Sequence, residues 1–275
     1  MEMILAEPCL PFLKWAGGKR WLVRDDVDVA PKRFKTYLEP FLGSGAVFFS
    51  LEPKKSILAD VNSELVNSYN VIKTNWRSVE SHLRKYEKSH DDEFYYKVRE
   101  AKPRNDVTRA ARFLYLNRTC WNGLYRVNLN GKFNVPRGSK DNVVLDTDNF
   151  RQTSRVLSNA QVLCQDFEVT LDMAVKGDFV YVDPPYTVNH NQNGFLKYNN
   201  NIFSWTDQIR LKQAVVRAVD RGAMVTVSNA DHESIHALWK DVCEPQQVQR
   251  SSVIAGQSKY RKKTSEVLLR IGWKP

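Results

Sequence analysis

Residues 179–186 read Phe-Val-Tyr-Val-Asp-Pro-Pro-Tyr, and this stretch indicates the fold. A short run of valine and aromatic residues is typical of a buried strand, and two consecutive prolines must end it. We therefore expect Asp183 and Tyr186 on a stiff turn at the carboxyl end of a strand. In open α/β sheets, ligands bind at that end of the strands.

The turn suits attack by the exocyclic amino group of a planar base. Such an amine is a poor nucleophile because its lone pair is delocalised into the ring. The Asp183 carboxylate and the Pro184 carbonyl can accept its two N–H bonds, and the Tyr186 ring offers a face for stacking. A proline-terminated surface strand without any chemistry is the alternative for these four residues taken alone.

Length and composition indicate a globular protein. The 275 residues are 42% hydrophobic and 26% charged, enough for one α/β domain or a core domain with an insertion. No apolar run reaches 18 residues and the first 11 residues lack a signal-peptide pattern, so we expect neither a membrane span nor a signal peptide. Four cysteines without CxxC spacing argue against a disulfide framework or a cysteine zinc site and fit a reducing cytoplasm. The formal charge of +10 favours a polyanionic partner.

Residues 35–62 predict a strand, a glycine turn, a helix and a second strand. Gly43 and Gly45 lie in the turn, and Asp60 ends the second strand, 17 residues after Gly43. This separation is close to the roughly 20 residues of a nucleoside-binding βαβ unit. Glycines let the backbone approach a ligand closely, and a carboxylate can accept both ribose hydroxyls.

Residues 63–158 differ from their flanks, because they contain helical patterns at about 64–87, 92–101 and 106–118 and few strand signals. Alternating strands and helices resume near residue 161 and continue to residue 271. We therefore predict an α/β fold with a mainly parallel, Rossmann-like sheet. Its core domain would comprise residues 1–62 and 159–275, and residues 63–158 would form an inserted, mainly helical domain.

A β-hairpin is predicted within the inserted domain. Asn130-Gly131 is a strong hairpin-turn dipeptide, and apolar and polar residues alternate on both sides of it. A hairpin with Asn, Arg and Lys along its sides can enter the major groove of DNA. An ordinary surface hairpin is the alternative.

Together these motifs resemble those of DNA adenine-N6 methyltransferases of the α arrangement (D12 class), and most closely the Dam family, which methylates GATC. The resemblance extends over nearly the whole chain. The matching segments, in chain order, are a cofactor motif at 12–19, the glycine loop at 39–45, a ribose-binding strand end at 58–62, the entry to and exit from a recognition hairpin at 114–126 and 134–136, the catalytic tetrapeptide at 183–186, and late elements at 228–229 and 261–263. This order defines the α arrangement. After Pro136 the chain reads Arg-Gly-Ser-Lys, without the aromatic residue that the family places there.

The resemblance implies a site-specific enzyme that transfers a methyl group from S-adenosylmethionine to N6 of adenine in duplex DNA, within GATC, by base flipping and direct transfer. S-adenosylhomocysteine would be the product, and no metal is expected. Residues 63–158 would then be the target-recognition domain of a methyltransferase with a Rossmann-like sheet. The expected partner is double-stranded DNA, bound by a monomer in the cytoplasm of a prokaryotic cell or phage-infected host, at the nucleoid.

The resemblance also assigns residues to three roles. The expected catalytic residues are Asp183, Pro184, Pro185 and Tyr186. The expected cofactor contacts are Trp15, Gly17, Lys19, Phe41, Gly43, Gly45, Asp60, Asp166, Phe167 and Asp183. The expected DNA contacts are Lys14, Asn122, Leu124, Arg126, Asn134, Pro136, Arg261, Lys262 and Lys263.

Other chemistries remain open at this point. Residues 232–236 read His-Glu-Ser-Ile-His, the pattern of zinc proteases, for which a surface helix is the alternative. Methylation of cytosine C5 needs a cysteine nucleophile, but the one Pro-Cys pair, Pro8-Cys9, precedes every motif. Methylation of cytosine N4, RNA or protein glutamine can use a similar tetrapeptide. A DNA-binding protein without catalysis is a further possibility.

Overall fold

The computed structural model describes residues 9–25, 27–128, 131–188, 203–250 and 264–275. The chain divides into two units, which we describe separately. The first comprises Met1–Val23, Gly43–Lys54 and Asp60–Cys164, and the second comprises Arg24–Leu42, Lys55–Ala59 and Gln165–Pro275. The predicted bounds, residues 1–62 and 159–275 for the core domain and 63–158 for the insertion, differ from the bounds of these two units. They stay a prediction.

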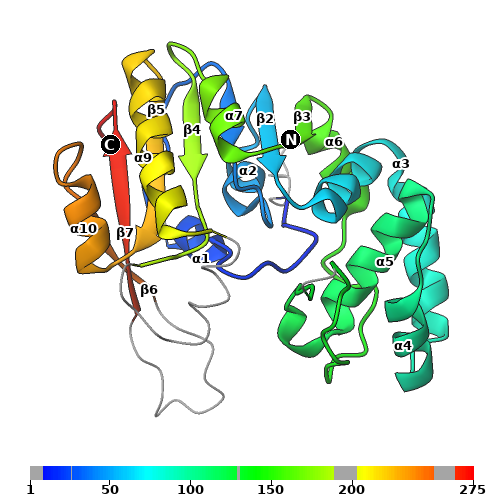
Figure 1. Cartoon of the computed structure of the whole chain (residues 1–275). Helices are drawn as coiled ribbons and strands as arrows, with labels where there is room; N and C mark the ends of the chain where they lie inside the picture. The colour runs from blue at the N-terminus through cyan, green and yellow to red at the C-terminus, as the bar shows by residue number, and fades with distance from the viewer. Residues whose placement is uncertain (1–8, 26, 129–130, 189–202, 251–263) are drawn as a thin grey trace. The chain divides into compact units, whose positions relative to one another are not determined.

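The described strands of the second unit pair into a sheet, and all their residues belong to this unit apart from Asp60 at the end of one of them (Figure 1). Its strand order is β2-β1-β4-β5-β7-β6, with bounds β1 Tyr37–Glu39, β2 Ser56–Asp60, β4 Phe179–Val182, β5 Met224–Ala230, β6 Gln246–Arg250 and β7 Thr264–Ile271. β1 pairs in parallel with β2 and β4, and β4 pairs in parallel with β5. β7 is antiparallel to β5 and β6. The predicted Rossmann-like, mainly parallel sheet is confirmed.

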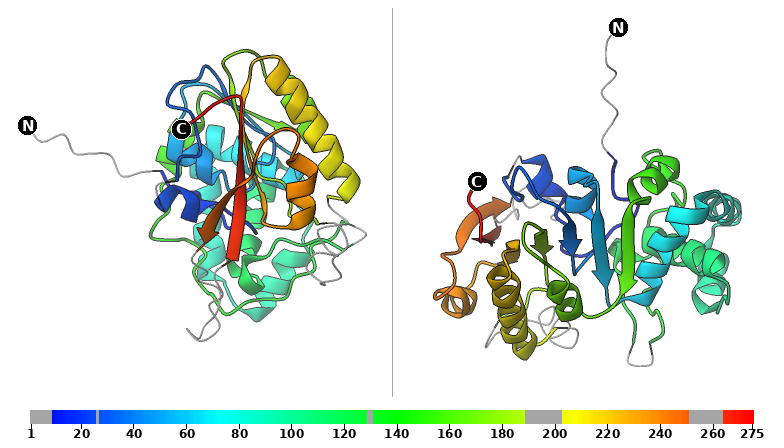
Figure 2. Two further views of the ribbon diagram at one scale, coloured as in Figure 1. Left: turned by 90° about the vertical axis from the view of Figure 1, so that its left-hand side faces the viewer. Right: turned by 90° about the horizontal axis from the view of Figure 1, so that it is seen from above.

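Three helices of the second unit pack on one face of this sheet, as the view from above shows (Figure 2). They are α7 (Phe167–Asp172), α9 (Trp205–Asp220) and α10 (Glu233–Trp239). Their core residues include Leu171, Leu211 and Trp239, which are fully buried with the valines of β4 and β5. All four residues of β4 are buried. A parallel strand covered on both faces reads as a continuous apolar run, and this explains the sequence pattern at 179–182.

The strand order reverses between β1 and β4. From β1 the chain proceeds to β2 on one side, and β4 lies on the other side. In sheets of this kind, ligands bind in the crevice outside the carboxyl ends of the strands at such a switch point. β1 leads into Pro40 and Phe41, and β4 leads into Asp183.

The first unit is mainly helical. Its elements are α1 (Arg20–Arg24, which continues one residue beyond the unit), α2 (Ala46–Leu51), α3 (Ser63–Lys88), α4 (Asp92–Glu100), α5 (Asp106–Thr119), the 3-10 helix η1 (Trp121–Gly123), α6 (Phe150–Leu157) and strand β3 (Ala160–Cys164). The helices expected at 64–87, 92–101 and 106–118 correspond to α3, α4 and α5. Side chains of Asn62 and Asn105 cap the first turns of α3 and α5, which pack against each other. No helix among the described residues is long and apolar enough to cross a membrane.

A buried ion pair joins α5 to the loop before α6. Side chains of Arg118 and Asp148 are only 2% and 7% exposed, and the guanidinium donates to both carboxylate oxygens at 2.7 Å. Arg118 also donates to the carbonyls of Val143 and Phe12, at 2.7 and 2.8 Å. One side chain therefore ties together three segments that are distant in the sequence.

Asp148→Ala should lower the free energy of unfolding by about 3–5 kcal/mol, because it leaves the buried Arg118 charge without its carboxylate. The matched control is Glu80→Ala, which removes an exposed ion pair to Arg84 on α3 and should cost less than about 1 kcal/mol. Urea denaturation followed by circular dichroism measures both. Equal losses in the two variants would contradict the structural role of the buried pair.

Candidate functional site

The tetrapeptide Asp183–Tyr186 follows β4 directly, as predicted. The prolines lack a backbone N–H, so parallel pairing of β4 cannot continue past Val182. The Tyr186 hydroxyl donates to Glu266 Oε2 at 2.7 Å. Burial, together with the negative charges of Asp183 and Glu266, raises the pKa of Tyr186 well above its usual value. Tyr186 is therefore a neutral phenol that donates a hydrogen bond.

The charge of Asp183 also acts on two further tyrosines, Tyr37 and Tyr181. Tyr37 on β1 donates from its hydroxyl to Glu39 Oε2 at 2.9 Å, and the hydroxyls of Tyr181 and Ser228 lie 2.7 Å apart. Burial is the largest cause that raises the pKa of both tyrosines, and the charge of Asp183 contributes to each. The carboxyl ends of β1 and β4 thus carry carboxylates among neutral phenols, which are good hydrogen-bond donors to them.

Three phenylalanine rings pack against one another beyond the end of β1. The rings of Phe41 and Phe167 stack with their centroids 5.3 Å apart, and Phe203 meets both edge-on at 5.6 Å. Phe41 and Phe167 were predicted as cofactor contacts, and the structure brings them together. Such a pair of flat apolar faces suits the ring of a nucleoside.

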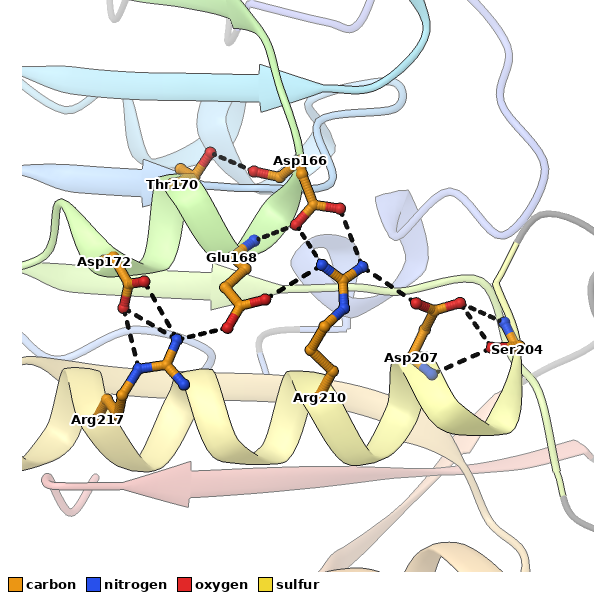
Figure 3. A network of polar contacts seen from close by, with 8 residues as sticks. All are labelled: Asp166, Glu168, Thr170, Asp172, Ser204, Asp207, Arg210 and Arg217. Carbon is orange, nitrogen blue, oxygen red and sulfur yellow. Dashed lines mark hydrogen bonds and ion pairs between the residues drawn. The ribbon is translucent and has the colours of Figure 1, made fainter.

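Asp166 is held in place by Arg210 of α9 (Figure 3). Its Oδ1 and Oδ2 accept from the guanidinium at 2.9 and 3.0 Å, and Oδ1 also caps α7 by accepting from the Glu168 amide. The same guanidinium lies 4.2 Å from the Phe167 ring centroid. One arginine therefore orients both members of the predicted Asp166-Phe167 pair.

The polar network extends along α9 on both sides of Arg210. Towards the start of the helix, Arg210 donates to Asp207, whose carboxylate forms a capping box with Ser204. Towards its end, Arg217 donates to Glu168 and Asp172 of α7 (Figure 3). The network fastens α7, which begins at Phe167, to α9.

In the first unit, Trp15 lies against the glycine loop. A Cβ atom added at Gly43 would be 2.7 Å from Trp15 Cδ1, closer than a side chain tolerates. Gly43 also has φ +46°, which favours glycine. The Trp15 ring stacks on Tyr125 with centroids 5.9 Å apart and contacts Phe113 at 6.3 Å. Gly43 is therefore required here both by the backbone and by the close approach of the indole.

Asp60 fastens the same loop at the end of β2. Its Oδ2 accepts from the Gly43 amide at 3.1 Å, and its Oδ1 accepts from the Asn62 amide at 2.9 Å. Burial raises the pKa of this carboxyl, while the backbone hydrogen bonds act in the opposite direction. The backbone amides of Gly43, Asn62 and Val61 all bond to this carboxylate, which has about four acceptor sites, so capacity remains for a ligand's hydroxyl.

The other predicted cofactor residues of this unit lie near the beginnings of α1 and α2. Lys19 precedes α1 and is 3% exposed; its ammonium donates to the Gly17 carbonyl at 2.7 Å. Gly17 itself is exposed, with φ +78°. Gly45 is the N-cap residue of α2, with φ +64°. The positive φ at Gly45 agrees with the glycine turn predicted there.

The predicted hairpin is present in a reduced form. Val127 and Phe133 form an isolated antiparallel bridge, and the Asn128 amide donates to the Lys132 carbonyl at 2.8 Å. The structure brings together two of the predicted DNA contacts, because Arg126 Nε donates to Asn134 Oδ1 at 3.0 Å. Asn130 of the predicted turn lies outside the described residues.

The remaining predicted DNA contacts of this unit surround the hairpin's entry and exit. Asn117 donates from Nδ2 to the Lys14 carbonyl at 2.7 Å and accepts from the Lys14 amide at 2.9 Å. The Lys14 side chain lies against Gly123, and burial together with the like charge of Lys140 lowers its pKa to about 8. Predicted contacts on either side of the hairpin are exposed or half-buried, namely Asn122, Leu124 and Pro136. Arg261, Lys262 and Lys263 lie outside the described residues.

Four residues contact predicted site residues but were not themselves predicted as site residues. They are Tyr125, Asn117, Arg210 and Glu266. A lone acidic residue before the apolar run Val-Leu-Leu of β7 is the one signal that could have pointed to Glu266. The other contacts depend on segments brought together by folding.

The zinc-protease pattern at 232–236 serves a structural purpose. His232 precedes α10 and caps it by accepting from the Ser234 amide, so the two histidines do not both lie within the helix. His236 Nε2 instead pairs with Asp231 Oδ1 at 2.8 Å. Over the described part of the chain, no group of three or more His, Cys, Asp and Glu side chains is arranged to hold a metal ion.

Comparisons with known proteins agree with the motifs. The family model of D12 class N6 adenine-specific DNA methyltransferases matches residues 15–253. The type II methyltransferase M1.LlaDCHI of Lactococcus lactis subsp. cremoris is 34% identical over 268 residues, 94% of each chain. The type II methyltransferase M.MjaIII of Methanocaldococcus jannaschii is 42% identical over 80% of this chain and 84% of its own, and the DNA adenine methylase of Salmonella typhi is 33% identical over 94% and 93%. The chain belongs to the D12 class N6 adenine-specific DNA methyltransferases, and it is an S-adenosylmethionine-dependent enzyme of that family.

Proposed function

We propose that this enzyme methylates N6 of adenine within GATC in duplex DNA, and that it flips the adenine out of the helix to do so. The observation that carries the proposal is the Asp-Pro-Pro-Tyr turn at the carboxyl end of β4, beside the switch point of the sheet. Extruding a base costs a few kcal/mol, which contacts in the protein must offset.

The catalytic work of the turn is positioning. Asp183 and the Pro184 carbonyl would accept the two amino hydrogens of adenine and thereby direct the nitrogen lone pair out of the ring plane. Tyr186 would stack against the base. Pro184 and Pro185 restrict the backbone to this arrangement, so little reorganisation is needed when the base arrives.

The cofactor residues fit S-adenosylmethionine in their chemistry. Asp60 retains acceptor capacity for ribose hydroxyls, Lys19 can pair with the methionine carboxylate, and the Trp15 face suits a sulfonium. Gly17, Gly43 and Gly45 would keep the backbone close to the ligand, and Phe41, Asp166 and Phe167 would hold its adenine. When bound, S-adenosylmethionine supplies a methyl group activated by its positive sulfur. We propose that the sulfur–methyl bond breaks as the N6–methyl bond forms, without a covalent intermediate on the protein, and that N6 then loses its surplus proton to solvent.

DNA would be read by the hairpin. Arg126 would donate to the O6 and N7 atoms of guanine, a contact worth about 1–3 kcal/mol of discrimination, and Leu124 would meet a thymine methyl group. Asn122, Asn134, Pro136 and Lys14 would contact DNA nearby. We assign phosphate contacts to Arg261, Lys262 and Lys263 on their charge alone. We further propose a monomeric, cytoplasmic enzyme that modifies the two strands of a site in turn, and residues 63–158 as its target-recognition domain.

Asp183→Ala should reduce kcat by about 10³-fold or more, because it removes an acceptor for the amino hydrogens. Its affinity for S-adenosylhomocysteine, measured by calorimetry, should stay within a few-fold of the wild type. The assay follows N6-methyladenine in DNA that lacks adenine methylation. Near-normal turnover in this variant would contradict the proposed mechanism.

Gly43→Ala should weaken S-adenosylhomocysteine binding at least tenfold, because its Cβ would displace the Trp15 indole. The matched control is Gly131→Ala, which has a similar strained φ of +70° but nothing within 4 Å of the added Cβ. Both variants place an alanine in a left-handed backbone conformation and are strained for that reason. Only Gly43→Ala also displaces Trp15. Calorimetry that finds equal affinity in the two variants would exclude the Trp15–Gly43 contact from cofactor binding.

DNA affinity should fall as the pH rises through about 8. Lys14 loses its proton near that pH in the free protein, and DNA favours the charged form, so between pH 7 and pH 9 the Kd should rise about tenfold. Lys14→Arg stays charged and should show a flat profile over this range. Fluorescence anisotropy at constant salt measures both proteins, and the same slope in the arginine variant would contradict a role for Lys14.

A further inference from the structure

Glu266 is a buried carboxylate on β7, a strand that the proposed mechanism does not use. It is 4% exposed, and its neighbours across the sheet are Ala230 on β5 and Val248 on β6. A carboxylate in such a position is costly unless strong hydrogen bonds compensate for the lost water. An apolar side chain would pack better at this position. Packing alone therefore does not explain why a carboxylate is found here.

The Tyr186 hydroxyl supplies one such bond. Its oxygen lies 2.7 Å from Glu266 Oε2, within the usual range of an O–H···O hydrogen bond. Tyr186 stands on the turn after β4, whereas Glu266 stands on a strand paired on both sides. The contact thus ties the far end of the tyrosine ring to the rigid sheet.

The two prolines fix the backbone before Tyr186, but they do not fix its side-chain torsions. A tyrosine held only at its Cα could rotate about χ1 and χ2 and present its ring at many angles. Anchoring the hydroxyl oxygen restricts χ1 and so sets the direction of the ring axis. The oxygen lies on the χ2 axis, so the ring plane is set by the O–H bond instead: conjugation keeps that bond in the ring plane, and a fixed acceptor therefore favours one plane for stacking.

We propose that Glu266 is a positioning residue that fixes the plane of the Tyr186 ring against which the target adenine stacks. The inference rests on the proposed function, because it requires that Tyr186 receives the base. In this proposal Glu266 acts through its hydrogen bond from Tyr186. Its charge matters as well as its shape, because a charged acceptor holds a hydroxyl more strongly than a neutral one.

A double-mutant cycle tests the inference. Glu266→Ala should lower kcat by about tenfold or more while the KM for S-adenosylmethionine changes less than about twofold. Tyr186→Phe keeps the ring but loses the hydroxyl, and its kcat should fall by a similar factor. Adding Glu266→Ala to Tyr186→Phe should cost less than about twofold more. Glu266→Gln retains a neutral acceptor and should restore part of the loss.

A fluorescent base reports the orientation of the ring directly. With 2-aminopurine at the target adenine, stacking on Tyr186 quenches the emission of the bound complex. Glu266→Ala and Tyr186→Phe should both raise that emission, a change that a loss of stability alone would not produce. Arg270→Ala removes a polar contact between β7 and the Asp28 carbonyl and serves as the control, with kcat and emission unchanged.

Full additivity of the two losses, or an emission unchanged in Glu266→Ala, would overturn the inference while leaving the proposed function in place. A wild-type enzyme that binds S-adenosylhomocysteine but methylates no adenine would overturn both. If Glu266→Ala does not fold, the cycle built on Glu266→Gln decides, since its smaller loss should also vanish in the Tyr186→Phe background.

Discussion

The position of the Asp183–Tyr186 turn depends on the pairing of β4 between β1 and β5. The strand is only four residues long, and all four are buried. Parallel hydrogen bonds on both sides and apolar packing on both faces fix its end, so the position of Asp183 follows from the core and not from the loop itself. Pro184 and Pro185 then restrict the backbone that carries the Asp183 carboxylate and the Tyr186 ring. A loop without this support would have to be ordered by the substrate at each turnover.

Several tyrosines and carboxylates of the second unit are buried together near the ends of β1 and β4. Three tyrosines, Tyr37, Tyr181 and Tyr186, have pKa values raised by burial and by the carboxylates nearby. They remain protonated at neutral pH and can donate hydrogen bonds to those carboxylates or to neighbouring hydroxyls. Charged acceptors that are satisfied in this way can lie at the edge of a hydrophobic core without a large loss of stability. Phenols supply hydrogen-bond donors to these carboxylates without adding positive charge.

Local sequence patterns predicted what is local in the fold. The β4 strand and its turn, the glycine loop with Asp60, and the helices α3, α4 and α5 each follow from composition and spacing within one segment. The anchors of the site could not be predicted in this way. Glu266 meets Tyr186 across 80 residues and Arg210 meets Asp166 across 44, through strands and helices whose packing no short pattern specifies. Among the described residues of the predicted hairpin, Val127 and Phe133 form an antiparallel bridge, and Arg126 and Asn134 contact each other through both backbone and side chain.

The most direct test incubates the purified protein with S-adenosylmethionine and plasmid DNA that lacks adenine methylation, and then maps modified bases by single-molecule sequencing. The account predicts N6-methyladenine confined to GATC, with both strands modified. Methyladenine at other or looser sites would contradict the proposed reading by the hairpin. The absence of methyladenine in a protein that binds S-adenosylhomocysteine would contradict the proposed reaction itself, and would direct attention to cytosine N4, RNA and protein acceptors.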